Sequence, residues 1–542
     1  MNKSAEKPDY IVVGAGSAGC VVAARLSDAG YRVALLEAGG SDKRFWIRVP
    51  VGYGKTFFDE KVNWKYLTQP DSGLNGRSSY WPRGKVIGGS SSINAMVYYR
   101  GLPHDYDDWA SAGNPAWSWN NVQDTFHNIE NFLDSRNKTH GSGVLKITDP
   151  GRWYHRIRDF YFNAARELKL PHNPNMIDGE GVGDYCITSR DGLRCSAANA
   201  FLYPALKNGR IELIQNATAQ HILFDDNRAT GIEYKKNGHT SRLYAKHEVI
   251  ICGGAINSPK LLEHSGIGGA QRLSSLGIDV VCDSPHVGEN LQDHIAISYF
   301  YRSKIPTLNN QLHSSWGKVL AGIRYLLTRK GPLALSVNQC GGFVRSDPSQ
   351  PVPNMQLYVS PITYSKSPDN KSTTVNPDSY AGFQLCFQPS RPKSRGSIHV
   401  DSTDPQDHPI IMPKYLSAED DVDDIVRGGV LMKQFAQSNA LGSIIEEPID
   451  ADPSHMSPDE LVEDFRNRAD TVFHPCGTCR MGMGVESSVV NERMKVHGAN
   501  GLRVIDASVF PNVTSGNTNG PTIMLAYRSA GFIIEDQQHS NL

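Results

Sequence analysis

The chain opens with two continuous apolar runs separated by a helical pattern. Residues 10–13 read YIVV and residues 33–36 read VALL. Continuous apolar runs are typical of parallel strands that are buried on both faces. Between them, apolar residues repeat with a helical period at positions 18, 21, 22 and 26, and Gly30 provides a helix end. The pattern predicts a strand, a helix and a second strand.

Three glycines connect the first strand to the helix. Gly14, Gly16 and Gly19 have the G-x-G-x-x-G spacing. The first allows a tight turn, the second lets the backbone approach a pyrophosphate, and the third lets helix and strand pack closely. Glu37 ends the second strand, where its carboxylate can bind ribose hydroxyls. These features predict a dinucleotide site with its phosphates at a helix N-terminus, and they leave open which dinucleotide binds.

Short strands return in the middle of the chain. Asn257 and Ser258 are suited to cap a helix that has Pro259 at its first position. A polar hairpin turn is expected at residues 225–227. The predicted strands here are residues 211–214, 219–224, 231–234 and 248–252.

A last strand and helix are predicted near the C-terminus. Residues 502–505 form an apolar run that ends at Asp506. A helix is expected to start near Pro521 and Thr522. The helix face that should pack on the sheet consists of Ile523, Ala526, Tyr527, Ala530 and Ile534.

The pattern changes between residues 301 and 470. Prolines and polar turns separate aromatic and β-branched runs such as residues 354–358 and 383–387, which favours a mostly antiparallel sheet with flanking helices. The polar stretch at residues 365–379 is either a mobile lid or a surface loop. Residues 41–79 show few periods and are expected to wrap the nucleotide site.

Composition limits the partners. The 542 residues include 55 Lys plus Arg and 56 Asp plus Glu, so no overall field directs the protein to nucleic acid or to an anionic membrane. Nine cysteines, an odd number over this length, do not form a disulfide framework pattern, and we expect a cytoplasmic protein. No apolar run reaches about 18 residues, so no membrane span is expected, while peripheral association stays open.

Two further stretches carry residues suited to chemistry. Residues 84–94 read GKVIGGSSSIN, a small-residue loop rich in N–H and hydroxyl donors that suits a polar cofactor or forms an ordinary turn. Residues 473–482 read FHPCGTCRMG. The imidazole of His474 can accept a proton near neutral pH, an effect worth about 10² to 10⁴ in rate, although a lone histidine is more often structural.

Cys476 and Cys479 form a C-x-x-C pair. A zinc site would need a second pair at suitable spacing, and a redox pair would open a helix in a thioredoxin-like unit. Neither context is present in the sequence. We therefore expect structural cysteines and no metal.

These stretches together resemble the glucose-methanol-choline family of FAD-dependent oxidoreductases. The similarity rests on the first glycine motif, GKVIGGSSSIN, GGAINSPKLLEHSGIG at 253–268, VGENLQDH at 287–294, HPCGTCRMG and SGNTNGPT at 515–522. The resemblance implies an α/β (α+β two-domain) fold. A discontinuous Rossmann-like FAD-binding domain would take residues 1–155, 196–300 and 471–542, and a mostly antiparallel substrate domain would take residues 156–195 and 301–470.

The resemblance also implies the site residues. His474 would take the hydroxyl proton of an alcohol, Asn519 would orient its oxygen, and Asn517 would face the flavin. Some relatives carry a histidine covalently joined to FAD where this chain has Ile93, so non-covalent FAD is expected. The implied FAD contacts are Gly14, Gly16, Ser17, Ala18, Gly19, Glu37, Ala38, Trp64, Arg83, Gly84, Val86, Gly89, Ser90, Asn94, Ala95, Met96, Val97, Ala219, Cys252, Gly253, Asp506, Ala507, Asn517, Asn519 and Thr522.

The expected function is FAD-dependent oxidation of an alcohol to an aldehyde or ketone. The signatures resemble most the branch of choline and alcohol dehydrogenases, and the electron acceptor would be oxygen, a quinone or an artificial dye. Three alternatives remain open from the sequence. They are a flavin-containing hydroxynitrile lyase of the same family, an NAD-linked dehydrogenase and a non-catalytic flavin-binding protein.

Overall fold

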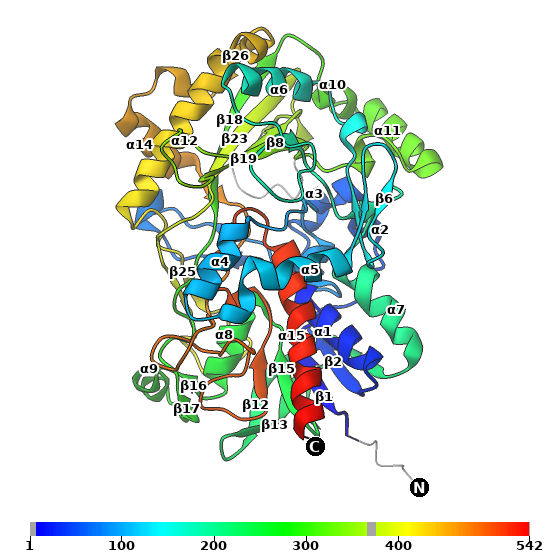
Figure 1. Cartoon of the computed structure of the whole chain (residues 1–542), viewed down its shortest axis with the longest axis vertical. Coiled ribbons are helices and arrows are strands. Elements are labelled where there is room, and N and C mark those ends of the chain that lie inside the picture. The colour runs from blue at the N-terminus through cyan, green and yellow to red at the C-terminus, as the bar shows by residue number, and fades with distance from the viewer. Residues whose placement is uncertain (1–6, 366–375, 541–542) are drawn as a thin grey trace.

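The protein contains two main β-sheets stacked along its long axis. The computed structural model describes residues 7–365 and 376–540. A parallel sheet lies in the lower half of Figure 1 and an antiparallel sheet lies in the upper half. Each sheet has its own large hydrophobic cluster, so the chain folds around two cores.

The parallel sheet collects strands from distant parts of the chain. Its order is β11-β2-β1-β15-β28, and every neighbouring pair is parallel. The predicted strands at both ends and in the middle of the chain are thereby confirmed. The strands are β1 (Tyr10–Val13), β2 (Val33–Glu37), β11 (Ile211–Gln215), β15 (Glu248–Ile251) and β28 (Leu502–Val504).

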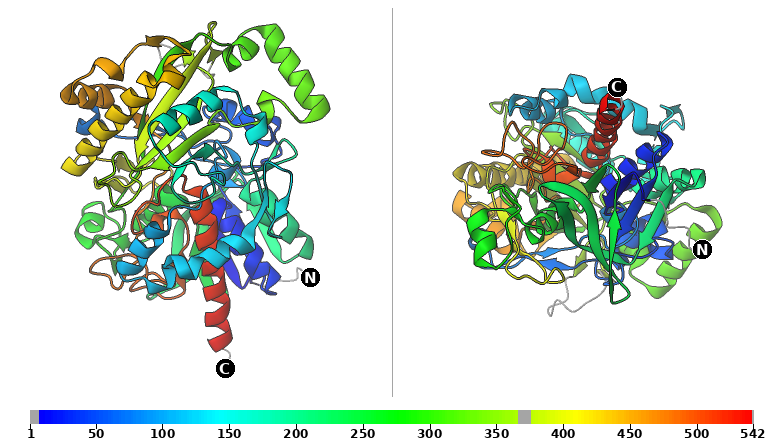
Figure 2. Two further views of the ribbon diagram at one scale, coloured as in Figure 1. Left: turned by 45° about the horizontal axis from the view of Figure 1, so that its top comes forward. Right: turned by 90° about the horizontal axis from the view of Figure 1, so that it is seen from below.

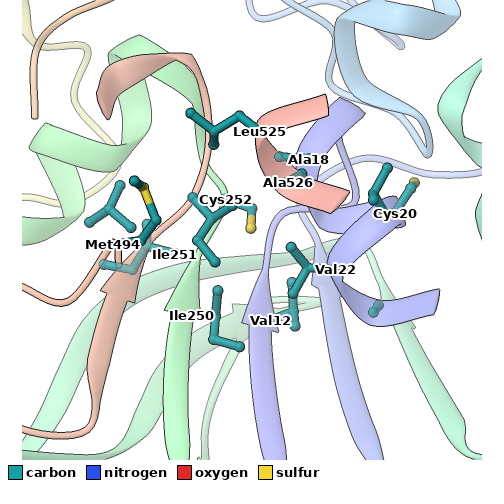
Figure 3. Close-up of a cluster of buried hydrophobic side chains, with 14 of the residues drawn as sticks. Val12, Ala18, Cys20, Val22, Ile250, Ile251, Cys252, Met494, Leu525 and Ala526 are labelled. Carbon is teal, nitrogen blue, oxygen red and sulfur yellow. The ribbon is translucent and has the colours of Figure 1, made fainter. Parts of the chain in front are cut away.

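Two helices from opposite ends of the chain pack together against this sheet. Helix α1 (Ser17–Asp28) and helix α15 (Asn519–Ser540) lie side by side, and the Arg25 guanidinium lies 3.9 Å from the centre of the Tyr527 ring. Figure 3 shows Val12 and Ile250 of the sheet below Ala18 and Leu525 of the two helices. Small side chains at this contact let the helices approach the strands closely.

Helix α8 (Gly254–His264) begins earlier than the sequence predicts, which corrects the expected cap at Asn257 and Ser258. Asp506 accepts a hydrogen bond from the Gly254 N–H at 2.8 Å, and the Ser258 hydroxyl accepts one from the Gly253 N–H at 3.0 Å. These acceptors satisfy N–H groups at the helix start, so the helix does not need a cap at 257.

Pro259 consequently lies inside helix α8 instead of at its first position. A proline has no N–H, so the carbonyl of Ala255 loses its intrahelical partner. The Thr478 hydroxyl donates to this carbonyl at 2.7 Å. A residue from the distant C-terminal part of the chain therefore replaces the missing helical hydrogen bond.

The second sheet is antiparallel at every pairing, as predicted for residues 301–470, and it also takes all of β8 and most of β18 from residues before 301. Its strands are β8 (Gly181–Asp184), β18 (Ile295–Ser303), β19 (Cys340–Val344), β20 (Met355–Ser360), β23 (Gly382–Pro389), β26 (Ile445–Ile449) and β27 (Asp470–Thr471). Flanking helices are α6 (Ile157–Glu167), α11 (Ser315–Thr328), α12 (Glu419–Gln437) and α14 (Pro458–Arg468). Figure 2 shows how these helices surround the sheet.

Smaller elements lie outside the two main sheets. The predicted strands at 219–224 and 231–234 are confirmed in a separate three-stranded sheet of β12 (Ala217–Asp225), β13 (Arg228–Lys236) and β14 (His239–Tyr244). Residues 41–79 form short pieces outside the parallel sheet, including α2 (Phe45–Arg48), α3 (Tyr53–Thr56) and β3 (Tyr66–Leu67). Further elements include α4 (Pro103–Ser111), α5 (Trp119–Ile129), α9 (Ala270–Ser275), α10 (Leu308–Leu312), α13 (Asn439–Gly442), β5 (Glu130–Leu133), β7 (Leu145–Thr148), β24 (Ser397–His399) and β25 (Ile410–Met412).

Two expectations remain untested by the fold. Most of the stretch at residues 365–379 lies outside the described residues, so the choice between lid and surface loop stays open. The domain boundaries also remain predictions. Within residues 7–365 and 376–540, no helix is both long and apolar enough to cross a membrane.

Candidate functional site

A cavity of about 2780 Å³ is bounded by both sheets. Its lower wall includes the carboxyl ends of β1 and β2, and its upper wall includes residues of β18, β20 and β23. Ligands of parallel α/β sheets bind at the carboxyl ends of the strands, where the connecting loops leave a crevice. All the residues that the resemblance implies line this cavity except Gly19 and Val86.

Gly19 and Val86 lie behind the cavity wall. A Cβ added at Gly19 would lie 1.8 Å from the carbonyl oxygen of Gly14, so this glycine permits the close contact of helix and strand. Val86 is fully buried in a small apolar cluster with Ile47, Val62 and Ile93. Both residues shape the cavity wall from behind, and neither of them lines the cavity.

The two glycine loops meet at the start of α1. A Cβ added at Gly89 would lie 2.7 Å from the Gly16 Cα, whereas a Cβ at Gly16 would meet no atom closer than 4.0 Å. Gly16 is also the N-cap of α1 and offers no side-chain acceptor to the first N–H groups of the helix. A side chain at Gly16 would occupy the open cavity, and the uncapped helix start suits an anion such as a pyrophosphate.

Glu37 lies beside these loops at the end of β2. Its carboxylate accepts the N–H of Ala15 at 2.9 Å and the N–H of Gly39 at 2.7 Å. Burial raises the pKa of Glu37 to about 7, and the two N–H groups oppose that rise. The hydrogen bonds fix the carboxylate at the cavity wall, where a ribose hydroxyl can donate to it.

The second loop presents Ile93 and Asn94 to the cavity. The Asn94 side-chain oxygen accepts hydrogen bonds from the Met96 N–H and from Arg194, at 3.1 and 2.7 Å. Ile93 belongs to the small apolar cluster and is 8% exposed. An aliphatic side chain has no nucleophilic atom, so this position cannot form the covalent flavin bond known from some relatives of the family it resembles.

The catalytic candidate His474 lies at the other end of the cavity, beside two polar side chains. Its Nε2 is 3.1 Å from the Asn517 amide nitrogen, and its Nδ1 is 3.0 Å from Nδ1 of His294. His294 Nε2 is in turn 3.0 Å from the carbonyl oxygen of Ser390. The His474 side chain is buried but lines the cavity.

This chain of contacts defines which ring nitrogen carries hydrogen. The Ser390 carbonyl can only accept, so His294 Nε2 donates and its Nδ1 is an acceptor. His474 Nδ1 must then donate to His294, which leaves a lone pair on His474 Nε2. That lone pair faces Asn517, whose amide N–H donates to it. His474 is held as a neutral base with its free nitrogen toward the cavity.

Burial keeps both histidines neutral. It lowers the pKa of His474 well below its ordinary value, and the nearby His294 and Arg83 add to the shift. Burial also lowers the pKa of His294 to about 4. A neutral His474 is ready to accept a proton at neutral pH.

A buried acid fixes the backbone of His474. Asp293 accepts the His474 N–H at 2.8 Å and the hydroxyls of Thr471 and Tyr415, each at 2.6 Å. Burial raises the pKa of Asp293 to about 6. Arg83 donates to the carbonyl of Phe473 at 2.7 Å. The loop segment that carries His474 is therefore held on both sides by hydrogen bonds.

The two asparagines of this loop have different side-chain partners. Asn517, assigned to the flavin, contacts His474, whereas the Asn519 oxygen accepts a hydrogen bond from Ser17 at 2.8 Å. Asn519 is the first residue of α15 and so belongs to the contact between α15 and α1. The Asn517 side-chain oxygen is buried and has no partner among the described residues. Such an orphaned acceptor fits a site that holds a polar ligand.

Cys476 and Cys479 are both buried, free thiols. Burial is the main cause that raises the pKa of both thiols, so neither cysteine is an activated thiolate. Within the described residues, no group of three or more His, Cys, Asp or Glu side chains could hold a metal ion.

His294 and Asp293 are the site residues that the sequence reasoning missed. The stretch that contains them was recognised as a landmark, but His294 lies 180 residues from its partner His474. No spacing rule connects residues so far apart. The antiparallel pairing of β18 with β27 and the bridge between Gln292 and Cys476 bring the two segments together.

Comparisons with known proteins give the family and the fold. Family models described as GMC oxidoreductase match residues 8–296 and 392–526. The chain is 40% identical to alcohol dehydrogenase [acceptor] of Pseudomonas putida, over 98% of this chain and 97% of that protein. It is 38% identical to mitochondrial choline dehydrogenase of Homo sapiens, over 98% and 90%. The crystal structure of pyridoxine 4-oxidase from Mesorbium loti superposes with a TM-score of 0.86 and 27% sequence identity. The match covers 97% of this chain and 99% of that protein's chain.

Proposed function

Because the chain belongs to the glucose-methanol-choline (GMC) family of FAD-dependent oxidoreductases, we propose that it oxidises an uncharged alcohol to the aldehyde or ketone. The observation that carries this proposal is the contact between the His474 Nε2 lone pair and the Asn517 amide inside the cavity. A base and a hydrogen-bond donor 3.1 Å apart can bind one hydroxyl group from two sides.

The residues of the cavity fit FAD. The uncapped start of α1 would hold the pyrophosphate, and Glu37 would bind the ribose. The start of α15 supplies a second positive helix end, which suits the flavin ring because that ring gains negative charge on reduction. Since Ile93 offers no nucleophile, we propose that the FAD is held without a covalent bond there. Bound FAD would supply the acceptor for the hydride of the alcohol.

His474 acts as the proton acceptor in this proposal. An alcohol hydroxyl that replaces the present Asn517 contact would donate to His474 Nε2 and accept from the Asn517 amide. As the proton moves to Nε2, negative charge develops on the oxygen, and the Asn517 N–H stabilises it. The role expected for Asn519 thus passes to Asn517, and we propose that Asn519 holds the end of α15 against α1.

His294 is proposed as a positioning residue for His474. Its unprotonated Nδ1 accepts the His474 Nδ1 hydrogen and thereby keeps the lone pair of His474 on the side of the cavity. The Ser390 carbonyl fixes His294 in the same way. This arrangement selects one tautomer of the base before the substrate arrives.

The wall opposite the loops points to an uncharged substrate. Paired strands place Ser298, Cys386 and Tyr358 in one row and Phe300, Gln384 and Ser360 in the next, and all six line the cavity. None of them carries a carboxylate. A quaternary ammonium such as choline would find no counter-charge in these two rows, where aromatic rings offer only weaker cation–π contacts, and the cavity-lining carboxylates Asp378 and Asp450 lie outside them. We therefore propose a neutral primary or secondary alcohol.

The acceptor and the compartment are proposed more broadly. Oxygen, a quinone or an artificial dye would reoxidise the enzyme. The nine cysteines are free, and most of them are buried. Free thiols are typical of a reducing compartment, so we propose the cytoplasm.

An anaerobic screen of alcohols tests the proposal. The purified yellow protein is mixed with 1-alkanols, aromatic alcohols and choline, bleaching of the flavin absorbance is followed, and oxygen is then admitted. We expect bleaching with formation of the aldehyde or ketone, and a preference of about a hundredfold in kcat/KM for a neutral alcohol over choline. Absence of bleaching combined with cleavage of hydroxynitriles would instead show a lyase. Equal bleaching by choline would refute the neutral substrate class.

A further inference from the structure

Helix α11 turns an apolar stripe outward. Trp316 is 75% exposed, Leu320 is 61% exposed and Leu327 is 80% exposed. The three other large apolar residues on this helix that are more than a third exposed are Val319, Ile323 and Leu326. Single exposed leucines are ordinary, but six on one helix of 14 residues form a continuous patch.

The spacing of these residues shows that the stripe is a helical face. Positions 316, 319, 320, 323, 326 and 327 follow the i, i+3, i+4, i+7 pattern of an amphipathic helix. Ala321 and Tyr325, which are buried, lie on the opposite side of the helix. The helix therefore packs on the protein with a narrow side and presents its wide apolar side to the outside. Figures 1 and 2 show α11 at the edge of the molecule.

The surroundings of the stripe are basic. No Asp or Glu occurs between residues 302 and 347, while Lys318, Arg324, Arg329 and Lys330 lie on or next to α11. A second segment, residues 43–58, also has four Lys or Arg and no acid, although Asp42, Asp59 and Glu60 flank it and Arg44 lies 3.9 Å from Asp59. Because positive and negative charges nearly cancel over the whole chain, its net charge does not reveal this local excess of Lys and Arg.

The second segment lies next to α11. Val49, Tyr325 and Ala334 form one buried cluster, so helix α2 and the turn after it are joined to α11. Helix α2 adds Phe45, 51% exposed, and Trp46, 43% exposed. We call the eight exposed apolar residues of α11 and α2 the α11 face.

The α11 face borders the active-site cavity. Phe45 and Leu326 are half-exposed and also line the cavity wall, so the cavity reaches the surface between the two helices. Lys318 and Gly322 line the same wall. A ligand that entered here would pass into the cavity directly from a partner bound to the α11 face.

We propose that the α11 face docks on an anionic lipid bilayer surface, with α11 lying in the plane of the interface. A wide apolar stripe with Trp and Leu, flanked by Lys and Arg, is the pattern of interfacial helices. At about 1.5 Å per residue, 14 residues reach about 21 Å, less than the bilayer core of about 30 Å. A second copy of the chain would bring two surfaces with an excess of Lys and Arg together, so charge disfavours that occupant.

The inference extends the proposed function without depending on the substrate. Docking would place the cavity mouth at a surface where apolar alcohols and quinones concentrate. Lipid binding can be measured on protein that has no substrate at all, so failure of one proposal leaves the other standing.

Vesicle flotation with the full-length FAD-loaded protein tests the proposal. The probes are phosphatidylcholine vesicles with about one quarter phosphatidylglycerol, and phosphatidylcholine vesicles alone. We expect binding to the anionic vesicles and a loss of about tenfold or more when the salt is raised to about 0.5 M. Failure to bind anionic vesicles, or equal binding to both kinds, would overturn it.

Variants assign the binding to the helix. Leu320→Glu with Leu327→Glu should reduce anionic vesicle binding by at least about tenfold, because both charges enter the stripe. Neither residue lines the cavity, so oxidation of a short water-soluble alcohol with a soluble dye should be unchanged. Met483→Glu is the matched control, since Met483 is 83% exposed elsewhere on the chain. A dimer in light scattering that the double variant dissociates, without vesicle binding by the wild type, would identify a second copy as the occupant.

Discussion

Asn517 and Asn519 are separated by one residue, yet their side chains contact different partners. Asn517 donates to the base nitrogen of His474, and Asn519 accepts from Ser17. We expect Asn517→Ala to slow anaerobic flavin reduction by about 10² to 10³, because one donor to a developing oxyanion is lost. Asn519→Ala is the matched control and should slow the step by less than about tenfold. Stopped-flow absorbance measures both, and the reverse order of effects would contradict the assignment.

The buried imidazole of His474 sets the pH dependence. The base must be unprotonated to accept the hydroxyl proton, and its pKa is lowered well below 6.5 by burial. The active form therefore persists as pH falls through 6.5 and is lost only at lower pH. We expect kcat/KM for flavin reduction to stay level through pH 6.5 on the acid side. A half-maximal value at or above pH 6.5 would show that the base is not buried in this way.

Ile93 predicts the fate of the cofactor on unfolding. An aliphatic side chain cannot form the covalent bond, so acid precipitation should leave a colourless pellet and release FAD into the supernatant. The absorbance spectra of the two fractions measure this. Replacement by histidine, Ile93→His, provides a comparison in which a bond can form. A yellow pellet from the unchanged protein would place a covalent link elsewhere.

At the scale of single residues, the sequence predicts His474 better than the side chains that contact it. His474 follows from a distinctive motif, and the structure places it in the cavity. The roles of Asn517 and Asn519 stay predictions, because sequence order in a loop does not show where a side chain points. His294 could not be found, since its contact with His474 depends on strand pairing between distant segments.

Helix α8 shows how one element depends on another. Pro259 leaves the Ala255 carbonyl without an intrahelical donor, and Thr478 supplies one. Thr478→Val should therefore destabilise the protein by about 1 to 3 kcal/mol, the cost of an unpaired buried acceptor. In a Pro259→Ala background the new N–H can serve the carbonyl, so the same change should cost less. Thermal melting of the four proteins measures this coupling, and additive effects would contradict it.

The elements that were predicted correctly are those with strong local patterns. The continuous apolar runs became the parallel strands, and the proline-punctuated region became the antiparallel sheet. The start of α8 was wrong because its cap comes from Asp506, which lies far along the chain. A local sequence pattern cannot predict a helix cap whose acceptor lies in a distant part of the chain.

The whole molecule is held together around the cofactor cavity. Residues from the first helix, the middle strands and the C-terminal helix all line it. Removal of FAD should lower the melting temperature, and added FAD should raise it again as its concentration increases. At a hundredfold excess over Kd, bound FAD adds about 2.7 kcal/mol to the free energy of unfolding. Differential scanning fluorimetry measures the shift. A melting temperature that does not change with FAD would show that the first helix, the middle strands and the C-terminal helix hold together without the cofactor.

The family resemblance predicted the general architecture, and chain periodicity alone did not. Periodicity indicates strands, but it does not say that β28 lies beside β15, or that β11 lies beside β2. The proposed domain boundaries rest on that resemblance. The α11 face was not foreseen, because overall charge and hydropathy average out a local basic and apolar surface.

The place of β28 at the edge of the parallel sheet has a consequence for biosynthesis. The strand is Leu502–Val504, while its neighbour β15 is complete at Ile251. At about 5 to 20 residues per second, a ribosome needs about 12 to 50 s to make the intervening chain. During that time one edge of β15 has no strand to pair with. We expect the nascent chain to need protection from chaperones until its last forty residues leave the ribosome.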